Sequence, residues 1–381
     1  MKLCQHKTIY KNARIFCEDG QFRWSAFTVK DGYFQDIYLY EHPEDGVDLD
    51  GMLVIPGLVD VHNHGAMGAD FSDGDYEGIR KMANYLVTNG ITSFAPASMT
   101  LPYDVLEKAF QVATQFHKDA PNGCARLKGI HMEGPYFSEK KKGAQNGDYL
   151  KDPDFAAFKM LFDKSEGLIR IVDVAPELPG ARAFAQKASK LCTVSVAHTD
   201  ATYEEARGVY EAGASHLTHL YNAMPGIHHR NPGPIGAASE NENVVAELIC
   251  DGLHVHESAV RIAFKLFPGR ICLISDALRC CGMPDGQYEL GGQDVFLQGG
   301  VARLMDGTIA GSATNLFECM KKAVSFGVPL EEAILSATAI PAKQLGCQDI
   351  GAIAPGKLAD FVVCTENLEK IAVYIGGNKI A

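Results

Sequence analysis

The sequence predicts an α/β protein: a (β/α)8 TIM barrel with a small β-sandwich domain formed by both chain termini. Two observations predict the barrel. Eight short apolar runs alternate with amphipathic segments, and metal-ligating residues repeatedly follow the ends of these runs. Such alternation favours a parallel sheet, and eight strands fit a closed barrel better than an open sheet. The β-rich composition of both chain ends predicts the second domain.

The first 55 residues are predicted to form β-strands. Turn signals such as Asp19-Gly20 and Asp31-Gly32 separate short runs that are rich in β-branched and aromatic residues. The C-terminal tail returns to this composition, notably in Ala359–Val363 and Ala372–Ile375. We therefore assign residues 1–55 plus 351–381 to the small β-sandwich domain and residues 56–350 to the barrel. The N-terminal runs are Thr8–Tyr10, Ala13–Phe16, Ala26–Val29 and Tyr33–Tyr38.

The barrel elements follow in order from Met52. The apolar runs are Leu53–Val61, Ile91–Ala97, Leu127–Met132, Ile169–Ala175, Thr193–Ala197, His216–Leu220, Val244–Cys250 and Ile271–Ser275. The expected helices between them are Tyr76–Thr88, Tyr103–Lys118, Phe155–Lys164, Ala181–Lys190, Thr202–Glu211 and Ser258–Phe267. Asp154 and Thr202 are candidate helix caps, whereas Tyr221–Asn243 is rich in Pro and Gly and not clearly helical.

The segments after the eighth run complete the barrel domain. Tyr288–Asp306 is predicted to be a hairpin insertion, because Gly-Gly and Asp-Gly turn signals punctuate it. Ala313–Phe326 and Leu330–Ala337 are predicted to be helices.

The bulk composition excludes several classes of function. The chain has 381 residues and a net charge of −12, so non-specific nucleic-acid binding is not expected. Neither a signal-peptide core nor an apolar stretch of the roughly 18 residues that a membrane span needs is present in the sequence. The 11 cysteines have no CxxC spacing, which favours reduced, buried thiols. We therefore expect a cytoplasmic protein with no membrane or nucleic-acid partner.

Ligand-type residues follow the ends of several apolar runs. His62 and His64 are two residues apart, so on a strand they project to one side. Alone this pair is weak evidence for a metal. Glu133 and His198 directly follow two further runs, and His219 lies at the end of a third, His216–Leu220. Barrel active sites lie at the carboxyl ends of strands. One carboxylate and two imidazoles suit a divalent metal with an open position for water.

The metal interpretation rests on the set rather than on single residues. Each histidine alone is more often a structural hydrogen-bonding residue, and Glu133 alone could be a turn residue. Asp276, after the eighth run, could cap a helix or could take a proton from a metal-activated water. Arg230 suits a phosphate group or is a solvated loop charge. His254 has a similar choice between a substrate contact and a structural hydrogen bond.

Segments along nearly the whole chain resemble the N-acetylglucosamine-6-phosphate deacetylases, a family of the amidohydrolase superfamily. The segments most specific to these deacetylases are His131-Met132-Glu133-Gly134-Pro135 and His219-Leu220-Tyr221-Asn222-Ala223-Met224. The other matching segments are Pro56–Gly65, Lys142–Asn146, Ala175–Glu177, Ala197–Ala201, Asp251–His254, Ser275–Ala277, Ala310–Ser312 and Gly351–Asp360.

The resemblance implies hydrolysis of N-acetylglucosamine 6-phosphate to glucosamine 6-phosphate and acetate. It makes Glu133, His198 and His219 the main metal ligands and Asp276 the catalytic acid and base. The cofactor would be a divalent metal (Zn, Fe, Mn or Co), with one or two ions per subunit. Arg230 would reach the site of the neighbouring subunit, which implies a homodimer. The implied substrate contacts are Ala144, Gln145, Asn222, Ala223, Arg230, His254, Ile309, Ala310 and Gly311.

Two features leave alternatives open. Members of the family often have His at the position of Gln145, so the resemblance leaves the phosphate affinity and sugar choice of this chain open. His62 and His64 are both present, with Glu133 able to bridge two ions, which leaves a two-metal site open. The alternative functions are deacetylation of N-acetylgalactosamine 6-phosphate, another amidohydrolase reaction such as hydrolysis of a cyclic amide, or non-catalytic binding of a sugar phosphate or metal.

Overall fold

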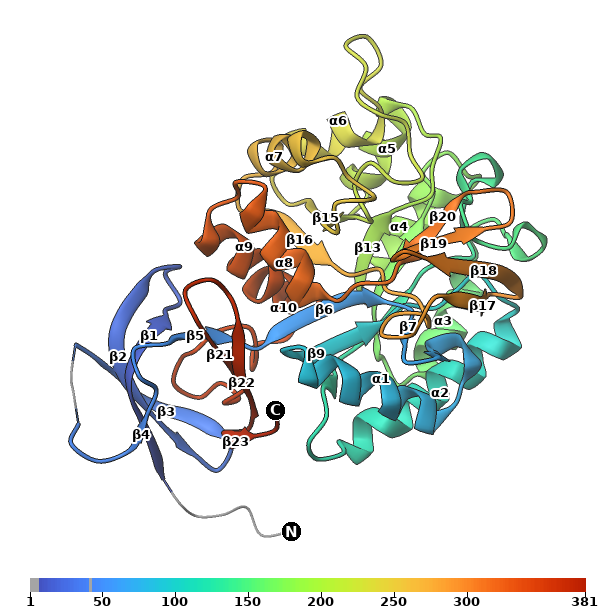
Figure 1. Ribbon diagram of the computed structural model, residues 1–381. Coiled ribbons are helices and arrows are strands. Elements are labelled where there is room, and N and C mark those ends of the chain that lie inside the picture. Colours follow the sequence, from blue (N-terminus) through green and yellow to red (C-terminus); the bar gives the residue numbers. More distant parts are fainter. Residues whose placement is uncertain (1–6, 41–42) are drawn as a thin grey trace.

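The computed structural model describes residues 7–40 and 43–381, and it joins both chain ends in one sheet (Figure 1). This sheet has eight strands in the order β23-β22-β21-β5-β1-β2-β3, with β4 paired to β1. Its strands are β1 (Thr8–Phe16), β2 (Phe22–Lys30), β3 (Tyr33–Leu39), β4 (Val47–Asp48), β5 (Leu53–Pro56), β21 (Phe361–Cys364), β22 (Lys370–Ile375) and β23 (Asn378–Lys379).

The terminal sheet has a hydrophobic core of its own. Phe361 from the C-terminal end stacks on Tyr374 with ring centroids 4.3 Å apart and meets the edge of Phe27 from the N-terminal end. Two of the expected N-terminal runs form one strand, β1, because a bulge between Tyr10 and Ala13 absorbs the break between them.

The first expected barrel run, Leu53–Val61, is wrong as a single element. Its first half, β5, pairs with β1 and β21 in the terminal sheet. Its second half, β6 (Leu58–Asn63), pairs with β9 (Ile91–Pro96) in the barrel. Gly57 lies at the division, where a Cβ atom would come within 2.0 Å of the Thr92 hydroxyl. The chain therefore passes from one sheet to the other where only glycine fits.

Eight parallel strands curl into a ring around the functional residues. Hydrogen-bonded ladders join most neighbours, and isolated parallel bridges between Ala97 and His131 and between Asn63 and Ala277 connect the remaining ones. This arrangement is consistent with a (β/α)8 barrel. After β6 and β9, the ring strands are β11 (Ile130–Met132), β12 (Ile169–Val174), β13 (Thr193–Val196), β14 (His216–Leu217), β15 (Val245–Ile249) and β16 (Ile271–Ile274). A short strand, β10 (Arg126–Leu127), extends the pairing of β9.

The helices lie outside the ring and agree with most sequence expectations. The Asp154 carboxylate caps the third helix, and Thr202 forms a capping box with Glu205 at the fifth. The helices are α1 (Tyr76–Thr88), α2 (Tyr103–Asp119), α3 (Phe155–Lys164), α4 (Ala181–Ala188), α5 (Tyr203–Glu211), α6 (Gly233–Glu240), α7 (Glu257–Leu266), α8 (Leu316–Ser325), α9 (Leu330–Ala337) and α10 (Ala339–Gln344). None of them, in the described part of the chain, combines the length and apolarity needed to cross a membrane.

Helix α6 departs from the expectation that Tyr221–Asn243 is irregular. Its residues from Gly233 to Ala238 are all buried, so it has no polar face and hence no amphipathic pattern. Pro234 stands in the first turn, where its missing N–H costs nothing.

The insertion after the eighth strand is a four-stranded antiparallel sheet rather than a single hairpin. It consists of β17 (Gly286–Leu290), β18 (Gln293–Gln298), β19 (Val301–Leu304) and β20 (Ile309–Ser312). A bridge between Ser312 and Ala277 returns β20 to the barrel mouth. Gly311 has φ +131°, and a Cβ there would lie 3.0 Å from the Asp276 carbonyl oxygen. Glycine thus allows β20 to pass close to the end of β16.

A buried ion pair ties the terminal sheet to the barrel. The carboxylate of Asp360, a residue only 5% exposed, accepts from Arg126 Nε at 2.8 Å and from the Gly376 N–H at 2.6 Å.

We expect Asp360→Asn to lower the free energy of unfolding by about 2 kcal/mol, because hydrogen bonds to a charged group are lost. Urea unfolding measures this. Glu366→Gln, at the exposed pair with Arg14, is the control and should change it by less than about 0.5 kcal/mol.

Candidate active site

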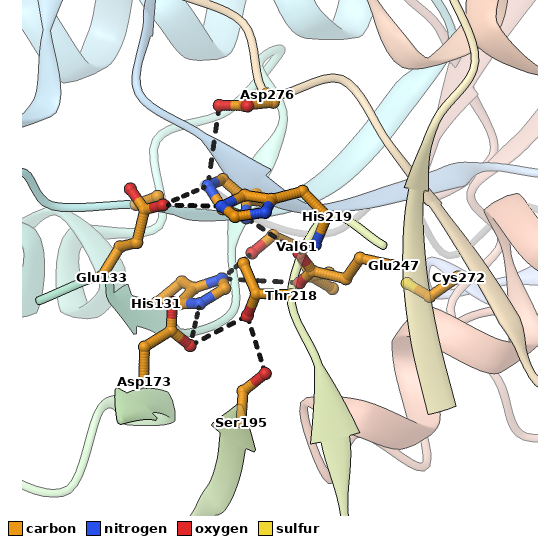
Figure 2. A network of polar contacts seen from close by, with 12 residues as sticks. Val61, His131, Glu133, Asp173, Ser195, Thr218, His219, Glu247, Cys272 and Asp276 are labelled. Atoms are coloured by element: carbon orange, nitrogen blue, oxygen red, sulfur yellow. Dashed lines mark hydrogen bonds and ion pairs between the residues drawn. The ribbon is translucent and has the colours of Figure 1, made fainter. Parts of the chain in front are cut away.

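The ligand-type residues converge at the carboxyl-terminal mouth of the barrel. Figure 2 labels Glu133, His219 and Asp276 among them. Three of them have left-handed backbone conformations, with φ of 43° at His198, 31° at His219 and 48° at Asp276. Such conformations are unfavourable for residues other than glycine by roughly 1–2 kcal/mol each. Backbone strain that persists in this way gathers at functional sites. Each strained residue is the second residue after the end of a barrel strand, and its side chain lies at the mouth.

Glu133, His198 and His219 form a compact triad. Glu133 Oε1 lies 3.0 Å from His198 Nε2 and 3.3 Å from His219 Nε2, and the two Nε2 atoms are 3.1 Å apart. The Nδ1 atom of each histidine faces a backbone carbonyl, from Lys141 at 2.9 Å and from Asn222 at 3.2 Å. A carbonyl only accepts, so each Nδ1 carries hydrogen and each neutral ring presents an Nε2 lone pair to the centre. Two lone pairs and a carboxylate in contact suit a cation.

His62 and His64 face the same carboxylate from its other side. His64 Nε2 lies 3.2 Å from Glu133 Oε2 and 3.3 Å from Asp276 Oδ1, while its Nδ1 is 3.1 Å from the Ala97 carbonyl oxygen. His62 Nε2 is buried without a hydrogen-bond partner, 3.7 Å from Glu133 Oε1. These residues therefore fit a second cation, with Glu133 between the two groups.

The charges of the site reinforce one another. Burial lowers the pKa of His64, but hydrogen bonds to Asp276 and Glu133 outweigh burial and raise this pKa to about 10. Burial raises the pKa of Asp276, but the charge of His62 and the hydrogen bond from His64 outweigh it and hold the pKa below its usual value. The carboxylates are thus anionic and attract positive charge, which a divalent cation supplies when the histidines are neutral.

A cavity of about 200 Å³ opens onto these side chains. It is lined by most of the predicted substrate contacts, namely Ala144, Gln145, Asn222, Ala223, His254, Ile309, Ala310 and Gly311. Arg230 does not line it. Its side chain is exposed on the loop before α6, which projects from the barrel, and its guanidinium lies 2.7 Å from His229 Nε2 (Figure 1).

Gln145 lines the cavity and also contacts the triad. Its amide nitrogen donates to Glu133 Oε2 at 2.8 Å, and its amide oxygen accepts from the Thr100 N–H at 2.7 Å. The Thr100 contact fixes which end of the amide faces Glu133. Gln145 therefore orients the carboxylate oxygen that faces His64.

Comparison with known proteins places this geometry in a family. The model of the amidohydrolase family matches residues 53–380. The chain belongs to the amidohydrolase family. A relative from Bacillus subtilis (strain 168), N-acetylglucosamine-6-phosphate deacetylase, is 35% identical over 97% of this chain and 93% of its own length. N-acetylgalactosamine-6-phosphate deacetylase from Escherichia coli O157:H7 is 32% identical over 97% of this chain and 98% of its own length.

A solved amidohydrolase structure superposes over nearly the whole chain. It is a mutant of N-acetyl-D-glucosamine-6-phosphate deacetylase from Mycobacterium smegmatis in complex with N-acetyl-D-glucosamine-6-phosphate. The TM-score is 0.92, the identity is 30%, and the match covers 98% of this chain and 99% of the other. Amidohydrolases generally depend on divalent metals, and the His and Glu groups of this chain are candidate ligands.

Several residues of the site escape the sequence analysis. Phe137 stacks on the His198 ring with centroids 4.3 Å apart, and Met99 and Thr308 line the cavity. Glu247 lies beneath the ligands within an apolar strand. A signal for Glu247 does exist, because a charged residue inside a buried strand requires a partner.

Proposed function

We propose that this amidohydrolase removes the acetyl group from N-acetylglucosamine 6-phosphate, giving glucosamine 6-phosphate and acetate. The observation that carries the proposal is that Glu133, Asp276 and four histidines line one small cavity. The histidines are His64, His198, His219 and His254. Relatives that span nearly all of the chain are named as deacetylases of this sugar phosphate. We propose the cavity residues Ala144, Gln145, Asn222, Ala223, His254 and Ile309–Gly311 as sugar contacts. His254 is oriented by Asp251 Oδ2, 2.7 Å from its Nδ1.

The side chains define roles for the reaction. A bound divalent cation would polarise the acetamide carbonyl and acidify a water molecule. Asp276 accepts a proton from the attacking water and later delivers a proton to the amine nitrogen as the C–N bond breaks. The lowered pKa of Asp276 makes it a carboxylate at the start of this cycle. Gln145, His64, His198 and His219 hold Glu133 in place while Asp276 exchanges protons.

The competing substrate is the galacto epimer, because the relative from Escherichia coli O157:H7 is named for it. We expect acetate release from both 6-phosphorylated N-acetylhexosamines on metal-quantified enzyme, with the larger kcat/KM for the gluco epimer. A larger kcat/KM for the galacto epimer would reverse the assignment. Absence of acetate from either sugar, with metal bound, would favour a cyclic-amide substrate or a non-catalytic binding role.

The role of Asp276 has a direct test. We expect Asp276→Asn to lower kcat by about 10²–10⁴-fold, because the amide cannot accept and return the proton. Steady-state acetate release measures the effect, while metal content and thermal unfolding verify that ligands and fold persist. Near-normal turnover of the folded, metal-loaded variant would refute the assignment.

We propose that Glu133, His198 and His219 hold the main ion and that His62 and His64 hold a second one. Replacing both His62 and His64 by Ala should therefore lower the metal content toward one ion per subunit. Elemental analysis after dialysis measures this. The control is His228→Ala/His229→Ala, which removes two adjacent histidines from the exposed loop and should leave the content unchanged. Loss of all metal from the first variant would make His62 and His64 the central ligands instead.

We propose a homodimer in which Arg230 binds the substrate phosphate of the neighbouring subunit. Its exposure on a projecting loop, outside its own cavity, supports this role. We expect Arg230→Ala to lower kcat/KM by about 10–100-fold, as for a lost charged hydrogen bond. An equal mixture of Arg230→Ala and Asp276→Asn subunits should recover about a quarter of the wild-type rate. About half of the dimers are then hybrids, and each hybrid has one whole site out of two. No recovery in hybrids would show that Arg230 does not act across subunits.

We further propose that residues 1–55 and 351–381 form a small β-sandwich domain beside a barrel domain of residues 56–350; residues 1–6 and 41–42 of this range lie outside the described part of the chain. The separate aromatic core of the terminal sheet supports this division. Buried free thiols such as Cys250, Cys272 and Cys319 are typical of reducing compartments and support a cytoplasmic location.

A further inference from the structure

A layer of fully buried ionisable side chains lies beneath the metal ligands (Figure 2). Glu247 is its centre. It projects from β15, where its neighbours are all buried, and none of its own surface is exposed. A carboxylate so deep in a barrel is retained only with strong partners, because desolvation of an unpaired charge is costly. The partners of Glu247 therefore indicate its role.

The Glu247 carboxylate connects both groups of ligands. Its Oε2 accepts from His62 Nδ1 at 2.9 Å and from the backbone N–H of His219 at 3.2 Å. Its Oε1 lies 3.0 Å from Nε2 of His216, which contacts none of the ligand atoms. Because Glu247 binds Nδ1 of His62, the Nε2 atom on the other side of the ring must face Glu133 and Asp276. There it has no hydrogen-bond partner.

Glu247 itself is not a ligand of an ion in this layer. Together with His62 and His131 it would form a group of ligand-type atoms. However, the two ring nitrogens of His131 lie 3.0 Å from the Val61 carbonyl oxygen and 2.9 Å from Asp173 Oδ1. A ring that donates from both nitrogens has no lone pair for a metal. The group is therefore a hydrogen-bonded support beneath the ligands.

We propose that Glu247 is the positioning residue of the second cation: it fixes the tautomer and orientation of His62 and couples them to the His219 backbone. Carboxylates that orient metal-binding histidines in this manner are a general feature of metal sites. The inference rests on the proposed function in one respect, the binding of a second ion by His62 and His64.

The test measures the affinities of both ions in Glu247→Gln by titration against a competing chelator. We expect the second ion to bind about 10–100-fold more weakly, since outer carboxylates contribute that much, while the first ion keeps its affinity. The matched control is Asp173→Asn, which removes an equally buried carboxylate that pairs with His131 and with no ligand. That variant should retain both affinities.

A combined variant separates this inference from the proposed second site. If His62→Ala alone keeps two ions at full affinity, the second site is wrong and the inference is overturned with it. If His62→Ala loses the second ion but Glu247→Gln binds it normally, the inference alone is overturned. In the His62→Ala background, Glu247→Gln should have no further effect on the second site, and an added loss there would show that Glu247 does not act through His62.

The wild-type protein provides a test that does not depend on folding of a variant. Nitrogen NMR of the labelled imidazoles in the zinc-loaded protein reports which ring atom of His62 carries hydrogen. We expect hydrogen on Nδ1 and the metal on Nε2. Hydrogen on Nε2 of His62 would overturn the inference.

Discussion

The contact of one carboxylate with several imidazoles is the interaction on which the site depends. Glu133 Oε1 meets His198 at 3.0 Å and His219 at 3.3 Å, and Oε2 meets His64 at 3.2 Å. Each of these rings is held at Nδ1 by a backbone carbonyl, so rotation away from Glu133 would break a buried hydrogen bond. The barrel thus holds the Nε2 lone pairs of these rings close to one another and to the Glu133 carboxylate. Only protons or metal ions can offset the repulsion between these electron-rich atoms.

The barrel strands explain why this cluster can be held so closely. Parallel strands end at one mouth, and their carboxyl ends bring distant parts of the chain together. The strained conformations at His198, His219 and Asp276 are compensated by the same contacts, because Glu133 and His64 anchor their side chains. The insertion then adds β20 at the mouth, where Gly311 lets the backbone approach Asp276 without a clash.

Much of this arrangement is predictable from the sequence because its signals are local. The ligand-type residues lie at or near the ends of apolar runs, and the caps at Asp154 and Thr202 mark helix starts. What is not predictable depends on tertiary contacts. The division at Gly57 follows from the proximity of Thr92, a residue on another strand. Likewise, the contact of Gln145 with Glu133 requires the loop that folds back over the mouth, and no spacing rule encodes it.

The interior of the barrel is layered, and the order of the layers explains the rigidity of the site. Along β15, the inward positions alternate from apolar Val245 to Glu247 to Ile249 at the cavity. Val245 belongs to an apolar cluster that includes Leu345, next to α10, so apolar side chains lie beneath the ionic layer. The charge of Glu247 is compensated by His62, His216 and the His219 N–H, which are all buried. His62 therefore has little freedom to turn, and Glu247 sets the geometry of the mouth from beneath.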